Sequence, residues 1–477
     1  MITFSLALII LIAGYFIYGR IVERHFGADA SRPVPSKTMA DGVDYIQLPT
    51  WKAYMIQFLN IAGLGPIFGA IMGARFGTSS YFWIVFGSIF AGGVHDYLSG
   101  MVSLRHGGES LTELVGRYLG DVIKKIFTIF TIILTVLICC VFVSQPAELL
   151  DNLTPPALNN IFWMCVVFLY YLLATLFPID KVIGRIYPVL GAALLFMAFG
   201  ILIALYVNHP PLPEIWNGFG VKYEKAPIFP MMFVSIACGA ISGFHATQSP
   251  MMARCVRSER NGRFVFYGSM ISEGVVALIW AAAATAYFQN HPTNDTAAAI
   301  AVNISRGWLG TVGGVFALLG VIAAPISSGD TALRSARLII ADALKFSQKE
   351  VHHRLMITIP IFAVALGLLY FSFSNKDGFN IIWRYFAWCN QVLSVFTLWA
   401  LSVYLAKRRK NFLMTLVPAL FMTFVTCTYI MVAPEGFRMP TKVAYPVTTL
   451  IVVDLLIFFW RWHWYYFKKN PDVSEDI

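Results

Sequence analysis

Apolar residues occur in this chain as long, nearly uninterrupted runs. Thirteen runs of about 17 to 25 residues recur along the 477 residues, and each is long enough to cross a hydrocarbon core of roughly 30 Å as a helix. The pattern therefore predicts an all-α polytopic membrane protein with about 13 transmembrane helices. The predicted spans are residues 2–18, 56–75, 80–104, 126–143, 160–177, 188–207, 228–248, 266–288, 308–326, 355–373, 381–405, 412–432 and 443–460.

Small and helix-breaking residues interrupt the second and seventh predicted spans. The interruptions are Asn60-Ile-Ala-Gly-Leu-Gly-Pro66 and Cys238-Gly-Ala-Ile-Ser-Gly-Phe-His245. Backbone groups freed by a broken helix cannot face lipid, so such breaks persist where they line a cavity or bind a ligand. The alternative is that they serve helix packing alone, because Gly and Pro are common in membrane helices. The predicted substrate-binding residues are Asn60, Ala62, Gly63, Gly65, Ser242, Gly243 and His245.

Five spans separate the equivalent breaks, and an odd number of spans reverses the direction through the membrane. This arrangement is typical of an inverted repeat and looks like the LeuT-type 5+5 transporter fold. We expect a single transporter domain over residues 1–477. Within it, residues 56–207 and 228–405 form the two repeats, residues 1–55 a peripheral helix with an inner loop, and residues 406–477 peripheral C-terminal helices.

Basic residues gather on one side of this predicted topology. Of the 35 lysines and arginines, 26 fall in one alternating set of loops and the tail, and six fall in the other set. Because cytoplasmic loops collect Lys and Arg, we expect the N-terminus outside and the C-terminus in the cytoplasm. No basic region precedes the first apolar run, so we do not expect a cleaved signal peptide. The net charge of +10 then faces anionic lipid and requires no nucleic-acid partner.

The remaining motifs exclude several classes of protein. The seven cysteines are scattered without a CxxC pair, which favours a packing role. Neither a GxxxxGK[ST] phosphate loop nor an HExxH or GxGD motif occurs, which argues against an ATP-driven pump and an intramembrane hydrolase. We therefore expect no enzyme activity and no cofactor.

Titratable residues lie inside predicted spans, where each is expensive unless it faces protein or water. His95 and Asp96 are adjacent in span 3, and Glu273 lies in span 8, the symmetry partner of span 3. The carboxylate of Asp96 can fix the tautomer of His95, so we expect these residues to couple transport to protons. The alternatives are a hydrogen bond to a neighbouring helix for the His-Asp pair, and snorkelling or capping for Glu273.

A second set of polar residues ends span 9. Ser327, Ser328, Asp330 and Thr331 place three hydroxyls and a carboxylate at its cytoplasmic end, and we count them among the ion-coupling candidates. Hard oxygen ligands suit a sodium ion, with Ser327 and Ser328 as its predicted ligands. In a LeuT-type arrangement this helix shares a sodium site with the break of span 2. The alternative is that the serines cap the start of a cytoplasmic helix.

Several of these segments together resemble the carbon-starvation A family. The segments are Asn60 to Pro66, Gly93-Val-His-Asp96, Arg105-His-Gly-Gly-Glu-Ser-Leu111, Ser242-Gly-Phe-His-Ala246 and Trp383 through Asn390-Gln391. The resemblance implies uptake of peptides, or of pyruvate in some members, across a bacterial inner membrane during carbon starvation. Phe244-His-Ala-Thr-Gln-Ser-Pro250 and the run from Ser327 to Thr331 depart from the family pattern.

Together these features predict a cation-coupled symporter that imports small peptides or a small carboxylate such as pyruvate. The coupling ion is a proton or sodium, the partners are the substrate and the lipid bilayer, and the sequence sets no oligomeric state. The alternative is an ion-independent facilitator or channel for small organic anions.

Overall fold

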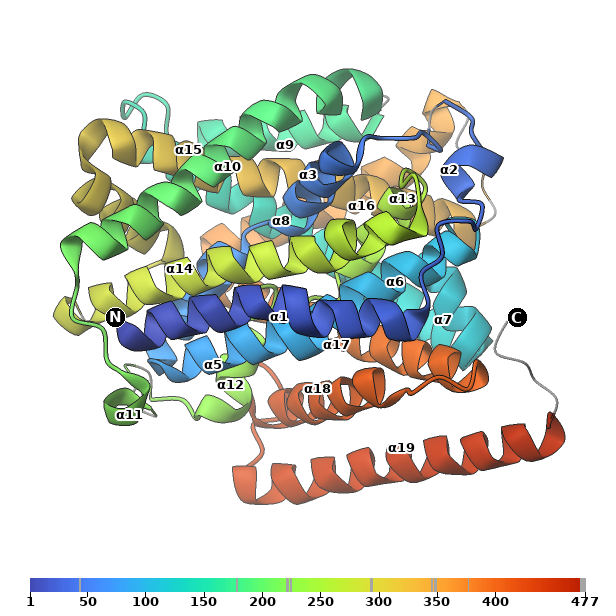
Figure 1. Cartoon of the computed structure of the whole chain (residues 1–477). Coiled ribbons are helices and arrows are strands. Elements are labelled where there is room, and N and C mark those ends of the chain that lie inside the picture. Colours follow the sequence, from blue (N-terminus) through green and yellow to red (C-terminus); the bar gives the residue numbers. More distant parts are fainter. Residues whose placement is uncertain are drawn as a thin grey trace.

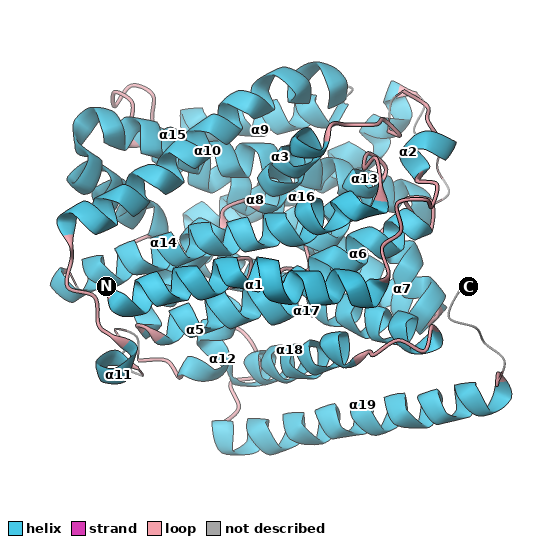
Figure 2. Cartoon of the chain, viewed as in Figure 1, coloured by secondary structure: helices cyan, strands magenta, loops and turns pink. Residues whose placement is uncertain are grey.

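The computed structural model describes residues 1–42, 44–176, 179–219, 223, 225–291, 295–344, 346, 350–375 and 377–471. All regular elements in this part of the chain are helical (Figure 2). The α-helices are α1 (Ile2–Phe26), α2 (Pro35–Thr38), α3 (Thr50–Ile61), α4 (Ala70–Gly73), α5 (Ser79–Phe86), α6 (Gly93–Arg105), α7 (Leu111–Leu119), α8 (Asp121–Asp151), α9 (Asn160–Leu176), α10 (Ile179–Asn208), α11 (Ile215–Gly218), α12 (Ile228–Ser235), α13 (His245–Ala253), α14 (Gly268–Asn290), α15 (Ala297–Ala343), α16 (Val351–Ser374), α17 (Gly378–Lys407), α18 (Leu413–Val432) and α19 (Thr441–Lys469).

The long helices form one bundle, in which most run in roughly the same direction across the view (Figure 1). Within the described residues, nine helices are long and apolar enough to cross a membrane, or ten if a bent pair at α3 counts as one span. This confirms an all-helical polytopic membrane protein. Each of the thirteen predicted apolar segments falls on helix, although α9, α12 and α13 are short. The count of thirteen spans and the 5+5 repeat stay predictions.

Several helices continue beyond their apolar segments, because a helix keeps its backbone hydrogen bonds where polar residues follow apolar ones. α15 extends to Ala343, well past the predicted end at residue 326, and Gly310 kinks it with a positive φ of 69°. α7 lies in the stretch 105–125, which the sequence predicts as a cytoplasmic loop. The helices therefore extend into stretches that the sequence predicts as connections between spans.

The first broken segment changes direction within three residues. α3 ends at Ile61, and helix resumes at Gly65 as a π-helical turn, η1 (Gly65–Gly69), that leads into α4. The two parts, Thr50–Ile61 and Gly65–Phe76, meet at an angle of 57°. Pro66 can stand in the first turn of the new helix, because the N–H that proline lacks has no helical partner there.

The second broken segment is longer. α12 ends at Ser235 and α13 begins at His245, so residues 236–244 lie between the two helices. The structure thus places the start of the break slightly before the predicted Cys238, and it makes His245 the first residue of the next helix instead of part of the interruption.

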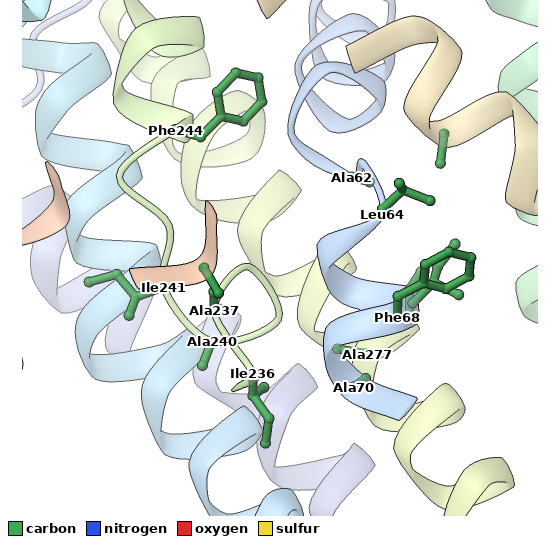
Figure 3. Close-up of a cluster of buried hydrophobic side chains, with 14 of the residues drawn as sticks. Ala62, Leu64, Phe68, Ala70, Ile236, Ala237, Ala240, Ile241, Phe244 and Ala277 are labelled. Carbon is green, nitrogen blue, oxygen red and sulfur yellow. The ribbon is translucent and has the colours of Figure 1, made fainter. Parts of the chain in front are cut away.

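The two broken segments lie side by side at the centre of the bundle. Figure 3 shows the first segment, with Ala62 and Leu64, next to the loop of the second segment, with Ile236 to Phe244; the side chain of Leu64 points away from that loop. A Cβ added to Gly65 would overlap the side chain of Cys238, and one added to Gly69 would lie 2.9 Å from the carbonyl oxygen of Ser235. Glycine is therefore required at these two positions so that the backbones can approach closely.

Candidate functional site

A chain of four titratable side chains connects the second break to α6 and α14. Nδ1 of His95 lies 2.8 Å from Oδ1 of Asp96, and Nδ1 of His245 lies 2.8 Å from Oδ2 of the same carboxylate. Nε2 of His245 lies 3.2 Å from Oε2 of Glu273. All four side chains are fully buried. We refer to His95, Asp96, His245 and Glu273 as the buried relay.

The geometry of the buried relay fixes where its protons can be. An ionised carboxylate only accepts hydrogen bonds, so the two Nδ1 atoms at Asp96 must each carry a hydrogen. Nε2 of His245 then faces Glu273, and this contact is favourable only if either the imidazole or the Glu273 carboxyl holds a further proton. Nε2 of His245 and Oε2 of Glu273 lie at ion-pair distance without a formed hydrogen bond, and this geometry is suited to a pair that shares a proton.

Both ends of the buried relay carry polar atoms that can donate or accept a proton. Nε2 of His95 and Oε1 of Glu273 are buried without a hydrogen-bond partner among the residues that the structure describes. Buried polar atoms are usually hydrogen-bonded, and the exceptions often have a functional reason. The arrangement is suited to passing a proton between a carboxylate on α14 and an imidazole on α6.

Asn390 of α17 holds the second break in place. Its Oδ1 accepts hydrogen bonds from the backbone N–H of Phe244 at 2.7 Å and from the hydroxyl of Ser242 at 3.0 Å. Its Nδ2 donates to Sγ of Cys238 at 3.2 Å, and its backbone carbonyl accepts from the N–H of Gly243 at 3.1 Å. A single asparagine thus satisfies several polar groups that the broken helix leaves unpaired.

The polar run of α15 lies against the end of α3. The hydroxyl of Ser328 donates to the carbonyl oxygen of Leu59 at 3.1 Å, and the hydroxyl of Ser327 lies 3.3 Å from the same oxygen. The hydroxyl of Thr331 donates to Oδ1 of Asn60 at 3.3 Å. Five oxygen atoms from two elements therefore converge beside the first break.

The alternative interpretation of the serine run as a helix cap is wrong. Ser327 and Ser328 lie inside the continuous part of α15, more than ten residues before its end at Ala343. Their hydroxyls bond to carbonyls instead of the free N–H groups that a cap would satisfy. The cap interpretation rests on the local sequence alone. In the tertiary structure, packing against α3 keeps this polar stretch helical.

Three residues beside the second break have side chains that bind metals in other proteins. The ligand atoms of Cys238, His245 and Glu273 all lie within 4.8 Å of one another. The sharing of a proton between His245 and Glu273, and the bond from Asn390 to Cys238, account for these contacts without an ion. We assign no metal to this group.

A buried ion pair joins three elements at the end of the bundle predicted to face the cytoplasm. Nε of Arg105, in α6, lies 2.9 Å from Oε1 of Glu259, and its second guanidinium nitrogen lies 2.9 Å from Oε2. The same guanidinium donates to the carbonyl of Gly27 at 2.7 Å and stacks on the ring of Phe26. This contact ties α1 and α6 to the segment that follows α13.

The structure thus arranges the predicted site residues in two groups. His95, Asp96, His245 and Glu273 form one group, with Ser242 and Gly243 beside it, and Ser327, Ser328 and Thr331 meet Asn60 in the other. Gly65 joins the groups through its contact with Cys238, and Gly63 packs near Ser328. Ala62 is buried within the first break, and the side chain of Asp330 lies outside what the structure describes.

Two residues of the site were not among the predicted site residues. Asn390 appears in the sequence as part of a polar pair inside an apolar span, and this is the signal that identifies it. Cys238 gives no such signal, because a lone cysteine in an apolar run is most often a packing residue. Its place at the crossing of the breaks follows from the tertiary structure alone.

The fold is similar to that of solved transporters of low sequence identity. A crystal structure of a mutant of the Eremococcus coleocola manganese transporter matches with a TM-score of 0.59 at 13% identity, covering 88% of this chain and 98% of that one. MhsT in complex with L-phenylalanine matches with a TM-score of 0.53 at 13% identity, covering 85% and 98%. At these identities the likeness shows the fold alone.

The chain belongs to the carbon starvation protein CstA family, whose sequence model matches residues 1–198, 148–308 and 293–429. An uncharacterized membrane protein of Haemophilus influenzae is 40% identical over 341 residues, which are 61% of this chain and 92% of the relative. The Bacillus subtilis peptide transporter CstA is 25% identical over 88% of both chains. The Escherichia coli pyruvate/proton symporter BtsT is 26% identical over 57% of this chain and 46% of its own length.

These findings confirm the resemblance to the family that was predicted from the sequence. The relatives with a named activity and the solved structures are transporters and not enzymes.

Proposed function

We propose that the chain is a proton-coupled symporter that imports a small carboxylate such as pyruvate, or a small peptide, across the bacterial inner membrane. The buried relay supports this proposal, because it brings an imidazole and a carboxyl group that can share a proton together directly beside the second break. The B. subtilis relative is named as a peptide transporter and the E. coli relative as a pyruvate/proton symporter, which supports both the substrate class and the ion.

Proton binding changes the charge of the buried relay by a full unit. With one proton shared between His245 and Glu273, the ionised Asp96 leaves the relay with a net charge of minus one. A second proton on this pair makes the relay neutral. A neutral cluster is less costly to hold away from water than a charged one, so protonation favours a closed, water-excluded state of the transporter.

The proposed substrate position is the crossing of the two breaks. There the first segment is interrupted between Ile61 and Gly65, the second between Ser235 and His245, and α13 begins at His245. The N-terminus of a helix favours a negative group, so the carboxylate of the substrate is expected to point toward it. The buried relay then couples to substrate binding because His245 belongs to both.

Sodium coupling is the second candidate, and the oxygen atoms beside the first break favour it. The hydroxyls of Ser327 and Ser328 each lie within hydrogen-bond distance of the carbonyl oxygen of Leu59. Preorganised hydroxyl and carbonyl oxygens can replace the water around a sodium ion. The two candidates make opposite predictions about which gradient drives uptake.

The test uses the purified chain in liposomes with a pH difference of one unit, acidic outside. One unit corresponds to about 1.4 kcal/mol, so a symporter that moves one proton per substrate concentrates labelled pyruvate about tenfold. We expect a protonophore to abolish this accumulation. Unlabelled dipeptide, pyruvate and alanine as competitors then identify the substrate class.

Single substitutions test whether the buried relay is what couples protons to uptake. His245→Gln is expected to lose accumulation while keeping exchange of substrate between the two sides. His106→Gln is the matched control, because His106 lies outside the relay and contacts Tyr118 and the carbonyl of Val102. Uptake that ignores both proton and sodium gradients would overturn the symporter and favour the ion-independent facilitator or channel.

A further inference from the structure

The last helix, α19, stands at the edge of the bundle. It packs mainly against α18, through the buried side chains of Ala444, Thr448 and Phe459 (Figure 1). The opposite face of α19 is exposed along its whole length. This face is the surface considered below.

The exposed face carries a regular pattern of residues at alternating spacings of four and three. The residues are Val443, Val447, Leu450, Asp454, Ile457, Arg461 and Trp464, and all of them are exposed. This is the heptad spacing by which two helices pack along a common seam. We refer to these seven residues as the α19 seam.

Asp454 lies at the middle of the α19 seam and of the helix. Its carboxylate is exposed between Leu450 and Ile457, and among the described residues none forms a hydrogen bond or an ion pair with it. An aspartate at the centre of a membrane helix is costly to hold in lipid and is usually paired or functional. Arg461 is seven residues away, about 10 Å along the helix, and the short side chain of aspartate cannot reach the membrane surface.

We propose that two copies of the chain pair through the α19 seam. Copies inserted in the same direction are related by a two-fold axis along the membrane normal, which brings identical positions of a parallel seam together. Asp454 of one copy then faces Asp454 of the other, and one protonated carboxyl donates a hydrogen bond to its ionised counterpart. Arg461 lies one heptad further along the same seam and offsets the remaining charge.

A second copy explains the α19 seam better than lipid does. Lipid tails cover apolar helix faces equally well at any spacing, so they require neither a heptad nor a central polar residue. A single polar residue in a seam fixes the register and the number of helices that pair. A second copy brings a second carboxyl group to Asp454, and a pair of carboxyls that holds one proton can form the hydrogen bond that lipid cannot supply.

Cysteine crosslinking in native membranes tests the seam. Leu450→Cys places a thiol in the seam, and Thr449→Cys places one at the same depth about 100° around the helix. Both are made with Cys165→Ser, because Cys165 is exposed. We expect Leu450→Cys to give at least tenfold more oxidised dimer than Thr449→Cys. Equal yields, or a crosslink from Leu450→Cys to a protein of another mass, would overturn the proposal.

Counting of subunits by photobleaching of single molecules in dilute liposomes tests the role of Asp454. We expect two bleaching steps for the natural chain and for Asp454→Asn, whose amide can still pair across the axis. Asp454→Leu is expected to bleach in one step and to insert normally, because it removes a polar group from lipid. One step for the natural chain means that lipid alone covers the seam, and contradicts the proposal.

Discussion

Nδ1 of His245 lies 2.8 Å from Oδ2 of Asp96, although 149 positions separate the two residues in the chain. The contact joins the first residue of α13 to α6, and thereby links the second break to the opposite predicted repeat. A carboxylate that accepts hydrogen bonds from two imidazoles is held rigidly, so a change of proton at Glu273 is transmitted through His245 to both elements.

Glu273 is expected to be the residue whose charge couples the proton to transport. Glu273→Gln keeps the size of the side chain and an oxygen near His245, but it cannot gain or lose a proton at working pH. Exchange of labelled pyruvate should persist, while accumulation under a one-unit pH difference should fall from about tenfold to none.

Glu148→Gln is the matched control for Glu273→Gln, because Glu148 is a partly buried glutamate of α8, outside the relay, that accepts a hydrogen bond from Thr296. Full accumulation by Glu273→Gln would remove Glu273 from the coupling mechanism. Loss of exchange as well would assign Glu273 to substrate binding.

The sodium dependence of uptake should show whether the second group of residues, which includes Ser327 and Ser328, binds the coupling ion. If sodium drives uptake, Ser327→Ala with Ser328→Ala removes two hydroxyl oxygens beside the carbonyl of Leu59 and should raise the sodium concentration needed for half-maximal uptake by tenfold or more. If protons drive uptake, the double variant should respond to sodium no differently from the natural chain. Initial rates over a sodium titration at fixed pH measure this.

The first break leaves little room beside Gly63. A Cβ at this position would lie 3.0 Å from Cζ of Phe142 and 3.3 Å from the hydroxyl oxygen of Ser328. Gly63→Leu should therefore abolish uptake, and Phe142→Ala should partly restore it in the double variant by making space. Gly307→Leu is the control, since nothing lies within 4 Å of its Cβ. No restoration in the double variant would mean that the backbone of the break, and not side-chain space, needs the glycine.

Asn390 should contribute strongly to stability. Asn390→Ala leaves the N–H of Phe244 and the hydroxyl of Ser242 without their acceptor, and a buried unsatisfied group costs about 1 to 3 kcal/mol. We expect a lower melting temperature in detergent. Asn303→Ala, which removes an exposed bond to Tyr287, should change it little. Equal effects of the two variants would contradict the supporting role.

The ion pair between Arg105 and Glu259 should matter far more than an exposed one. Both side chains are buried, and removing one partner from a buried pair costs about 3 to 5 kcal/mol. Glu259→Gln should thus destabilise the chain strongly. Glu109→Gln breaks the exposed pair with Arg117 and should cost less than about 1 kcal/mol. Thermal unfolding of both variants measures the difference.

The sequence predicts the parts of this molecule that depend on local composition. Apolar runs locate the helices, and the glycines from Gly63 to Gly65 locate the first break, because these signals act within one span. The pairing of His245 with both Asp96 and Glu273 depends on how three helices pack, and no local pattern contains that information. The serine run at Ser327 shows the same limit of sequence-based prediction. Its contact with Leu59 of α3, which accompanies its helical conformation, is not contained in the local pattern.

The close approach of Gly65 to Cys238 has a practical consequence. The thiol of Cys238 is covered by the backbone of the facing segment, so an alkylating reagent can reach it only while the two broken segments are apart. Its rate of modification therefore reports the fraction of time that the centre of the molecule is open. The natural thiol of Cys238 is thus a chemical probe of the transport cycle, and it requires no engineered cysteine at this position.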